Sequence, residues 1–107
     1  MRIKIHLYGM ACDNRYLIDD KAGLCEFNGE KINLDAAKVI DEIAGVIYNF
    51  PQEIKGNDVT DDISYDIMVE TDVVKTFKAR NARPENFYKL SNVLEIIENG
   101  NKVVRTR

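Results

Sequence analysis

The chain lacks the sequence features that membrane and secreted proteins require. Its 107 residues contain no uninterrupted apolar run approaching the roughly 20 residues that cross a bilayer, and no apolar segment of signal-peptide length follows the N-terminal methionine. Cys12 and Cys25 form no CxxC pair. We therefore expect a soluble, cytoplasmic protein without membrane contacts, whose two thiols stay reduced and unpaired.

Motifs typical of catalysis and metal binding are also missing. His6 is the only histidine, so a Ser-His-Asp or Cys-His arrangement would need it, yet no orienting partner is evident beside it. His6 and the two cysteines fit no zinc-site spacing, and the acidic segment 52–62 lacks the ligand pattern of an EF-hand. The six glycines form neither GxGxxG nor GxxxxGK[ST]. We predict no enzymatic activity, no cofactor and no metal site.

The composition suits a single globular domain over residues 1–107. Its residues are 45% hydrophobic and 31% charged, and a chain of this length can bury a core without disulfide or metal staples. Eighteen acidic residues against fifteen basic ones give a net charge of -3. This balance removes the general electrostatic attraction to nucleic acids, so DNA and RNA are not expected partners.

The first third of the chain predicts a meander of strands. Residues 2–8 alternate polar and apolar side chains, as in a half-buried strand. A loop over Gly9–Asn14 leads to a short strand at 16–18, and a third strand ends at Asn28–Gly29, a dipeptide typical of a type I′ turn. A brief extended piece at 30–32 completes this part.

A helix and a loop follow the meander. Asn33 is the expected N-cap, and Asp35 favours the helix dipole from the first turn. Apolar residues at helical spacing then continue as far as Pro51, which ends the helix. The polar segment Gln52–Asp62 is predicted to be a surface loop.

The next segment predicts a hairpin. Residues 63–69 alternate clearly between apolar and polar, and 73–80 supply a partner strand. A three-residue loop over 70–72 keeps the apolar residues of both strands on one face and pairs Tyr65 with Phe77.

A second helix ends the predicted fold. Pro84 suits its first position, Glu85 complements its dipole, and Gly100 is the expected C-terminal cap. The remaining residues 101–107 form either a frayed tail or an added edge strand.

These elements define an α+β domain of order βββαββα. Two helices amphipathic on one side should cover one face of an antiparallel sheet of four to five strands. The predicted core consists of Ile3, Ile5, Leu7, Ile40, Ile43, Ile47, Tyr65, Ile67, Val69, Phe77, Phe87, Leu90 and Leu94. The opposite, open face is expected to present Arg2, Lys4, His6, Tyr8, Asp66, Met68, Val74, Thr76, Lys78 and Arg80.

The order of features in the second half resembles emfourin, a small protein inhibitor of thermolysin-like metalloproteases, and related domains of unassigned function. The resemblance is carried by a Tyr-containing strand within Thr60–Val69, the strand residues Lys75–Phe77, and a Pro-started helix at Ala82–Phe87 and Leu90. An N-terminal strand, a loop and a first helix precede them, as in that family. The resemblance implies an α+β domain that inhibits a metalloprotease.

We therefore expect a non-enzymatic domain that binds, and inhibits, another protein such as a metalloprotease. Loops vary in shape while a rigid scaffold holds them, so a loop-rich edge is the expected contact surface. The residues predicted for this contact are Gly9, Met10, Asp13, Asn14, Asp58, Asp61 and Asp62.

Three alternatives stay open. The first is a toxin immunity protein or a phage- or plasmid-borne blocker of a host defence nuclease. The nuclease blocker would imitate phosphate charge with the carboxylates of Asp58, Asp61, Asp62, Asp66 and Glu70. A small enzyme or ligand-binding domain would use His6 and Tyr8, and a concave pocket over the open sheet face would indicate it. A third alternative is a homodimer formed through that open face.

Overall fold

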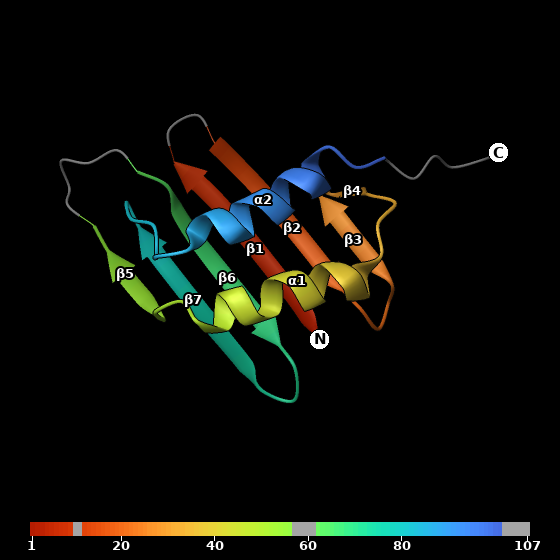
Figure 1. Cartoon of the computed structure of the whole chain (residues 1–107), viewed down its shortest axis with the longest axis horizontal. Helices are drawn as coiled ribbons and strands as arrows, with labels where there is room; N and C mark the ends of the chain where they lie inside the picture. The colour runs from red at the N-terminus through yellow and green to blue at the C-terminus, as the bar shows by residue number, and fades with distance from the viewer. Residues whose placement is uncertain (10–11, 57–61, 102–107) are drawn as a thin grey trace.

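The computed structural model describes residues 1–9, 12–56 and 62–101. These residues form one sheet, with strands in the order β4-β3-β2-β1-β6-β7-β5, and two helices that cross one of its faces (Figure 1). The strands are β1 (Arg2–Gly9), β2 (Cys12–Asp19), β3 (Leu24–Phe27), β4 (Glu30–Lys31), β5 (Glu53–Lys55), β6 (Ser64–Glu70) and β7 (Val74–Arg80). The helices are α1 (Ala36–Tyr48) and α2 (Phe87–Glu98).

The core lies between the sheet and the two helices. Apolar residues alternate along β1 and β6, and apolar stripes of α1 and α2 pack on them. Ile5 on β1 pairs with Ile67 on β6, which in turn pairs with Phe77 on β7. All of the predicted core residues are buried, so that prediction is confirmed.

The α+β class and the placement of both helices on one face agree with the sequence, but the predicted sheet of four to five antiparallel strands is wrong. The described residues form seven strands, and β5 runs parallel to β7. The segment Gln52–Asp62, predicted to be a loop, supplies β5: Lys78 donates its N–H to the Gln52 carbonyl at 2.8 Å, and Gly56 donates to the Arg80 carbonyl at 2.8 Å. This edge strand is held by its backbone, so its polar side chains gave no strand signal.

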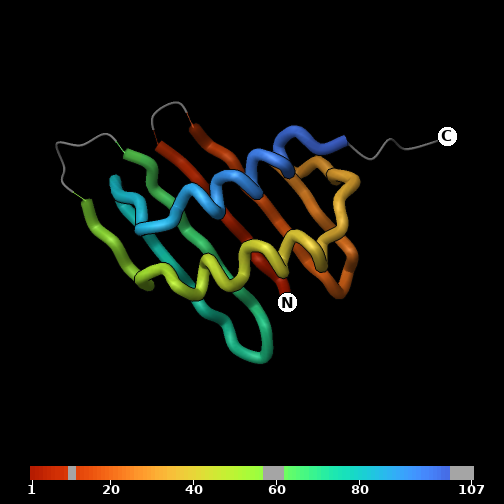
Figure 2. Tube along the Cα trace, viewed as in Figure 1, coloured from red at the N-terminus to blue at the C-terminus, as the bar shows by residue number. Residues whose placement is uncertain are grey.

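The predicted loop over Gly9–Asn14 is also wrong for most of its length. β1 extends to Gly9 and β2 begins at Cys12, with these two residues paired, so Asp13 and Asn14 belong to β2. The traces of β1 and β2 run side by side in Figure 2. The Asn28–Gly29 turn is confirmed by φ angles of 50° and 83°.

The hairpin between β6 and β7 has the predicted loop length but a different register. The loop consists of residues 71–73 rather than 70–72, and Thr71 donates its N–H to the Val73 carbonyl across it at 2.9 Å. Tyr65 therefore pairs with Ala79 rather than with Phe77. A shift by two residues keeps every side chain on its predicted face.

The helix ends also differ from the sequence-based expectation. Asp35, not Asn33, is the N-cap of α1, and its carboxylate accepts the N–H groups of Ala37 and Lys38 at 3.1 and 3.4 Å. The N–H of Asn33 instead donates to the Asn101 carbonyl at 2.6 Å.

The second helix starts later than predicted, whereas its C-terminal end agrees with the expected position of Gly100. Pro84 precedes α2 in a turn, because the Phe87 N–H donates to its carbonyl at 3.2 Å. Asn86 is the N-cap and Asn99 is the C-cap. Gly100 directly follows the C-cap, and its N–H donates to the Ile97 carbonyl at 3.1 Å.

Candidate functional site

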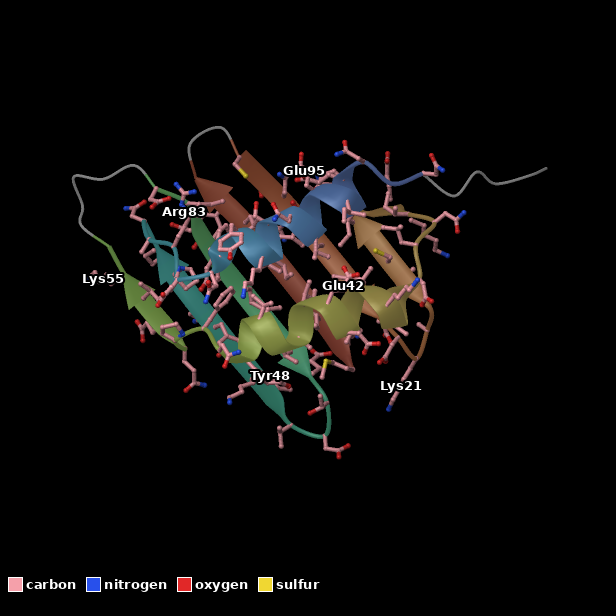
Figure 3. All side chains as sticks on the ribbon, in the orientation of Figure 1. Lys21, Glu42, Tyr48, Lys55, Arg83 and Glu95 are labelled. Carbon is pink, nitrogen blue, oxygen red and sulfur yellow. The ribbon has the colours of Figure 1, made fainter. Side chains whose placement is uncertain are left out.

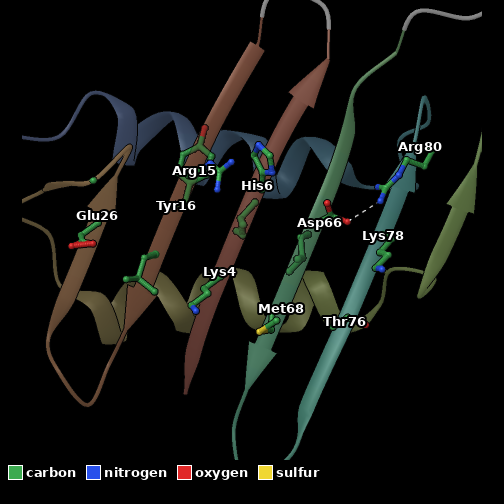
Figure 4. Close-up of a pocket in the computed structure, with 14 residues that line it drawn as sticks. Lys4, His6, Arg15, Tyr16, Glu26, Asp66, Met68, Thr76, Lys78 and Arg80 are labelled. Atoms are coloured by element: carbon green, nitrogen blue, oxygen red, sulfur yellow. Dashed lines mark hydrogen bonds and ion pairs between the residues drawn. The ribbon is translucent and has the colours of Figure 1, made fainter.

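A hollow of about 610 Å³ lies on the open face, the side of the sheet opposite the helices (Figure 4). Its lining comes from β3, β2, β1, β6 and β7, with Gly29 from the turn between β3 and β4. Both helices run behind the sheet in this view. The hollow is therefore formed by one layer of the fold.

Two cross-strand rows of side chains form its floor. The lower row runs across β2, β1, β6 and β7 as Leu17, Lys4, Met68 and Thr76. The upper row, displaced by two residues along each strand, runs as Arg15, His6, Asp66 and Lys78. Residues paired across strands share a face, so both rows point into the hollow.

His6 has a carboxylate partner. Its Nε2 atom lies 2.7 Å from Asp13 Oδ1, and its ring centroid lies 4.8 Å from that of Tyr8. The expectation that His6 lacks an orienting group is therefore wrong, because β2 is longer than predicted and brings Asp13 beside β1. The Asp13 side chain is 72% exposed, so water screens this pair strongly.

Arg80 also contacts the Tyr8 ring. Its Cζ atom is 5.6 Å from the Tyr8 ring centroid, and its Nη2 atom is 3.1 Å from Asp66 Oδ1. Its Nη1 group donates to the Tyr65 carbonyl at 3.2 Å. These contacts fix the guanidinium and balance its charge within the chain.

The hollow is positively charged although the chain as a whole is acidic. Its lining contains four cationic side chains and two carboxylates, a net charge of +2 with His6 neutral, whereas the chain carries -3. Arg80 and Asp66 pair with each other. Lys4, Arg15 and Lys78 form no ion pair within 1–9, 12–56 and 62–101.

The two segments predicted to bind a partner meet at one end of the sheet. A Cβ atom at Gly9 would lie 3.3 Å from the backbone oxygen of Asp62, so the two segments approach each other there. The Asp62 carboxylate accepts from Arg83 Nε and from the Ile63 N–H, both at 2.7 Å. Three of the predicted contact residues, Met10, Asp58 and Asp61, lie outside the described residues.

Asp13 and Asn14 point to opposite faces of the sheet. Asp13 joins His6 on the open face, whereas the Asn14 amide lies 3.5 Å from Glu98 Oε1 on α2. The buried Tyr16 hydroxyl donates to the same Glu98 oxygen at 2.6 Å. The pKa of Tyr16 is raised, chiefly because the phenol is buried and also because the Glu98 carboxylate lies beside it. The described residues predicted for partner binding therefore do not form one surface.

The part of the hollow that β2 and β3 supply was not expected from the sequence. Arg15, Leu17 and Glu26 line it, yet none was assigned to the open face. A signal was present, because Asp13, Arg15 and Leu17 alternate with residues of the helix-facing side. Because the loop was predicted over Gly9–Asn14 and the strand only at 16–18, this alternation was not recognised.

The described part of the chain contains no candidate metal cluster and no candidate membrane-spanning helix. No group of three or more His, Cys, Asp or Glu side chains there is arranged to hold a metal ion. Neither α1 nor α2, the helices of these residues, is long and apolar enough to cross a membrane.

Comparisons with models of known protein families, with curated proteins and with solved structures find no match to this chain.

Proposed function

We propose that the chain is a non-enzymatic, cytoplasmic domain that binds and inhibits another protein, with a metalloprotease as the first candidate. The metalloprotease is suggested by the resemblance to emfourin in the second half of the sequence. The observation that carries protein binding is the one-sided hollow of the open face. A cytoplasmic location fits Cys12 and Cys25, which form no disulfide.

The shape of the hollow favours a macromolecular partner. Its volume of about 610 Å³ is one that a small molecule could fill, but small-molecule sites bury most of the ligand between walls on several sides. A floor formed by one sheet contacts its occupant from one side only. A second protein can supply the opposite side and enclose the charged rows at a polar interface.

A ligand-binding domain or small enzyme is the second candidate, favoured by the hollow itself and by the His6–Asp13 pair. His6→Ala separates the two candidates. A binding domain should keep most of its inhibitory effect, because His6 is one of several lining residues. Complete loss of function in a His6→Ala protein that still folds would favour the enzyme.

The nuclease-blocker alternative gains no support from Asp62 and Asp66. Its phosphate mimicry needs free carboxylates, but Asp62 contacts Arg83 at 2.7 Å and Asp66 contacts Arg80 at 3.1 Å. Those charges are balanced within the chain.

An enzyme-inhibition titration tests the proposal. Increasing amounts of the protein are added to a thermolysin-like metalloprotease acting on a fluorogenic peptide, with a trypsin-like serine protease as the control enzyme. We expect metalloprotease activity to fall as the protein approaches an equimolar amount, while the control enzyme stays active. Mass spectrometry of the mixture must show the protein intact, because a digested protein would compete merely as a substrate. Undiminished metalloprotease activity would remove this enzyme as the partner.

A further inference from the structure

We propose that the hollow binds an extended, acidic segment of the partner protein, with Lys4, Arg15 and Lys78 as its cationic contacts. This inference rests on the proposed function, since it names the surface and the chemistry through which the partner is held. It replaces the predicted loop contacts with a surface formed by strands.

The charge distribution gives the first argument. The hollow carries +2, with Lys4, Arg15 and Lys78 unpaired among the described residues. The helices on the opposite side carry two lysines and four carboxylates, a net charge of -2. Glu42 on α1 and Glu95 on α2 lie on that side (Figure 3). The field of the protein therefore directs an acidic partner to the open face and away from the helices.

The spacing of the cations gives the second argument. Lys4 and Arg15 are diagonal neighbours on β1 and β2, which places them about 7–8 Å apart. Arg15 and Lys78 are separated by three strand spacings, about 14 Å. In an extended chain, carboxylates at positions i, i+2 and i+4 lie on one side and span about 13 Å. An extended segment with acidic residues at alternate positions therefore fits the three cations.

The side chains between the cations favour a polypeptide over a single-stranded nucleic acid. Leu17 and Met68 flank Lys4 in the lower row and are partly buried, so they can contact aliphatic side-chain atoms. Sequence-independent binding of single strands relies on aromatic rings that stack on the bases. The ring of Tyr8, which is not among the lining residues of the hollow, already contacts His6 and Arg80.

An NMR titration tests this assignment on the intact, ¹⁵N-labelled protein. The probe is a short peptide of alternating glutamate and threonine, and the control peptide has glutamine in place of glutamate. We expect the acidic peptide to shift the amides of β1, β2, β6 and β7 more than those of α1. Raising the salt concentration should abolish the shifts, because exposed charges are screened within about 10 Å at 0.1 M. The glutamine peptide should bind weakly or not at all.

Two charge-reversal variants make the test specific. Lys4→Glu with Arg15→Glu removes two cations of the hollow, whereas Lys38→Glu with Lys89→Glu makes the same change in net charge on exposed helix positions. The first variant should weaken peptide binding by about tenfold or more, because attractions become repulsions, and the second by much less. Lys78→Gln is the milder variant to use if the first fails to fold.

Several results would overturn the inference. These are the absence of binding by the acidic peptide, equal weakening in both charge-reversal variants, and tighter binding of a single-stranded RNA oligomer than of the peptide. The protease titration separates this inference from the proposed function. A folded Lys4→Glu, Arg15→Glu protein that still inhibits the metalloprotease fully would refute the hollow as the contact surface and leave the inhibitory function standing.

Discussion

Removing the buried hydroxyl of Tyr65 should stabilise the protein, whereas most substitutions in a core destabilise it. Tyr65 is fully buried, and its hydroxyl has no hydrogen-bond partner among the described residues. Its ring is stacked with Phe87 at a centroid distance of 5.9 Å and an interplanar angle of 6°, and it lies 6.2 Å from the Phe50 ring. Tyr65→Phe removes the hydroxyl and keeps both ring contacts.

The expected result is a more stable protein. A buried polar group without a partner costs about 1–3 kcal/mol, so Tyr65→Phe should raise the free energy of unfolding by an amount in that range. For a domain of this size, each kcal/mol corresponds to about 4–8 °C in Tm. Urea denaturation at neutral pH measures the change in free energy directly.

Tyr16→Phe is the matched control, because the same atom is removed from a hydroxyl that does have a partner. Tyr16 is buried and donates to Glu98 at 2.6 Å, so its substitution should destabilise the protein by about 1.5–3 kcal/mol, as for hydrogen bonds to charged groups. If Tyr65→Phe destabilised the protein as much as Tyr16→Phe does, the unpaired hydroxyl would be refuted.

The pH dependence of stability provides a second measurement on Tyr65→Phe. Burial raises the pKa of Tyr65 to about 12 from its ordinary value of 10.0. The folded state therefore holds the phenolic proton more tightly than the unfolded state does. The contribution of this proton to the free energy of unfolding is complete below pH 10 and is lost as the pH rises toward 12. The stability advantage of Tyr65→Phe over the unmodified protein should widen across that interval. An advantage that stays constant would mean that Tyr65 does not titrate as a buried phenol.

Substitutions at three other positions test the fold. Ile67→Ala, at a buried position in the middle of the sheet, should cost about 2–5 kcal/mol in urea denaturation, and an unchanged midpoint would contradict its placement. Asp35→Ala should cost about 0.5–2 kcal/mol by removing the α1 cap, whereas Asp35→Asn should cost much less. Gly56→Ala would bring a Cβ atom into the backbone carbonyl of Asn81, so it should separate β5 from β7. Hydrogen exchange at the Lys78 amide, which is bonded to the Gln52 carbonyl, should then become faster, and unchanged exchange would argue against this pairing.

Side-chain periodicity predicts the strands that border the core, because one side of each is apolar. β1 and β6 alternate throughout their length, and their inward residues are buried as expected. β5 shows the limit of this approach. Its sequence Glu53-Ile54-Lys55 has one apolar residue, and its place in the sheet depends on backbone bonds to β7, which no side-chain pattern records.

Periodicity also identifies the face on which a side chain lies without identifying its neighbour. His6 was correctly expected on the open face, but its contact with Asp13 depends on the β1–β2 register and on a second strand that begins at Cys12. The same register brings Arg15 beside His6 and diagonal to Lys4. The hollow could therefore not be deduced from the individual strand patterns.

Net charge has a similar limitation when it is used to infer binding. The charge of -3 argued against nucleic-acid partners, and the nuclease-blocker alternative placed its contact on carboxylates, yet Asp62 and Asp66 are paired with Arg83 and Arg80. The charge of the open face is therefore set by cations, including Lys4, that form no ion pair among residues 1–9, 12–56 and 62–101. Only unpaired charges are available to a partner at short range, because a paired carboxylate must first lose its cation. An acidic protein can therefore present a basic binding surface, and its partner must be chosen to fit that surface rather than the composition.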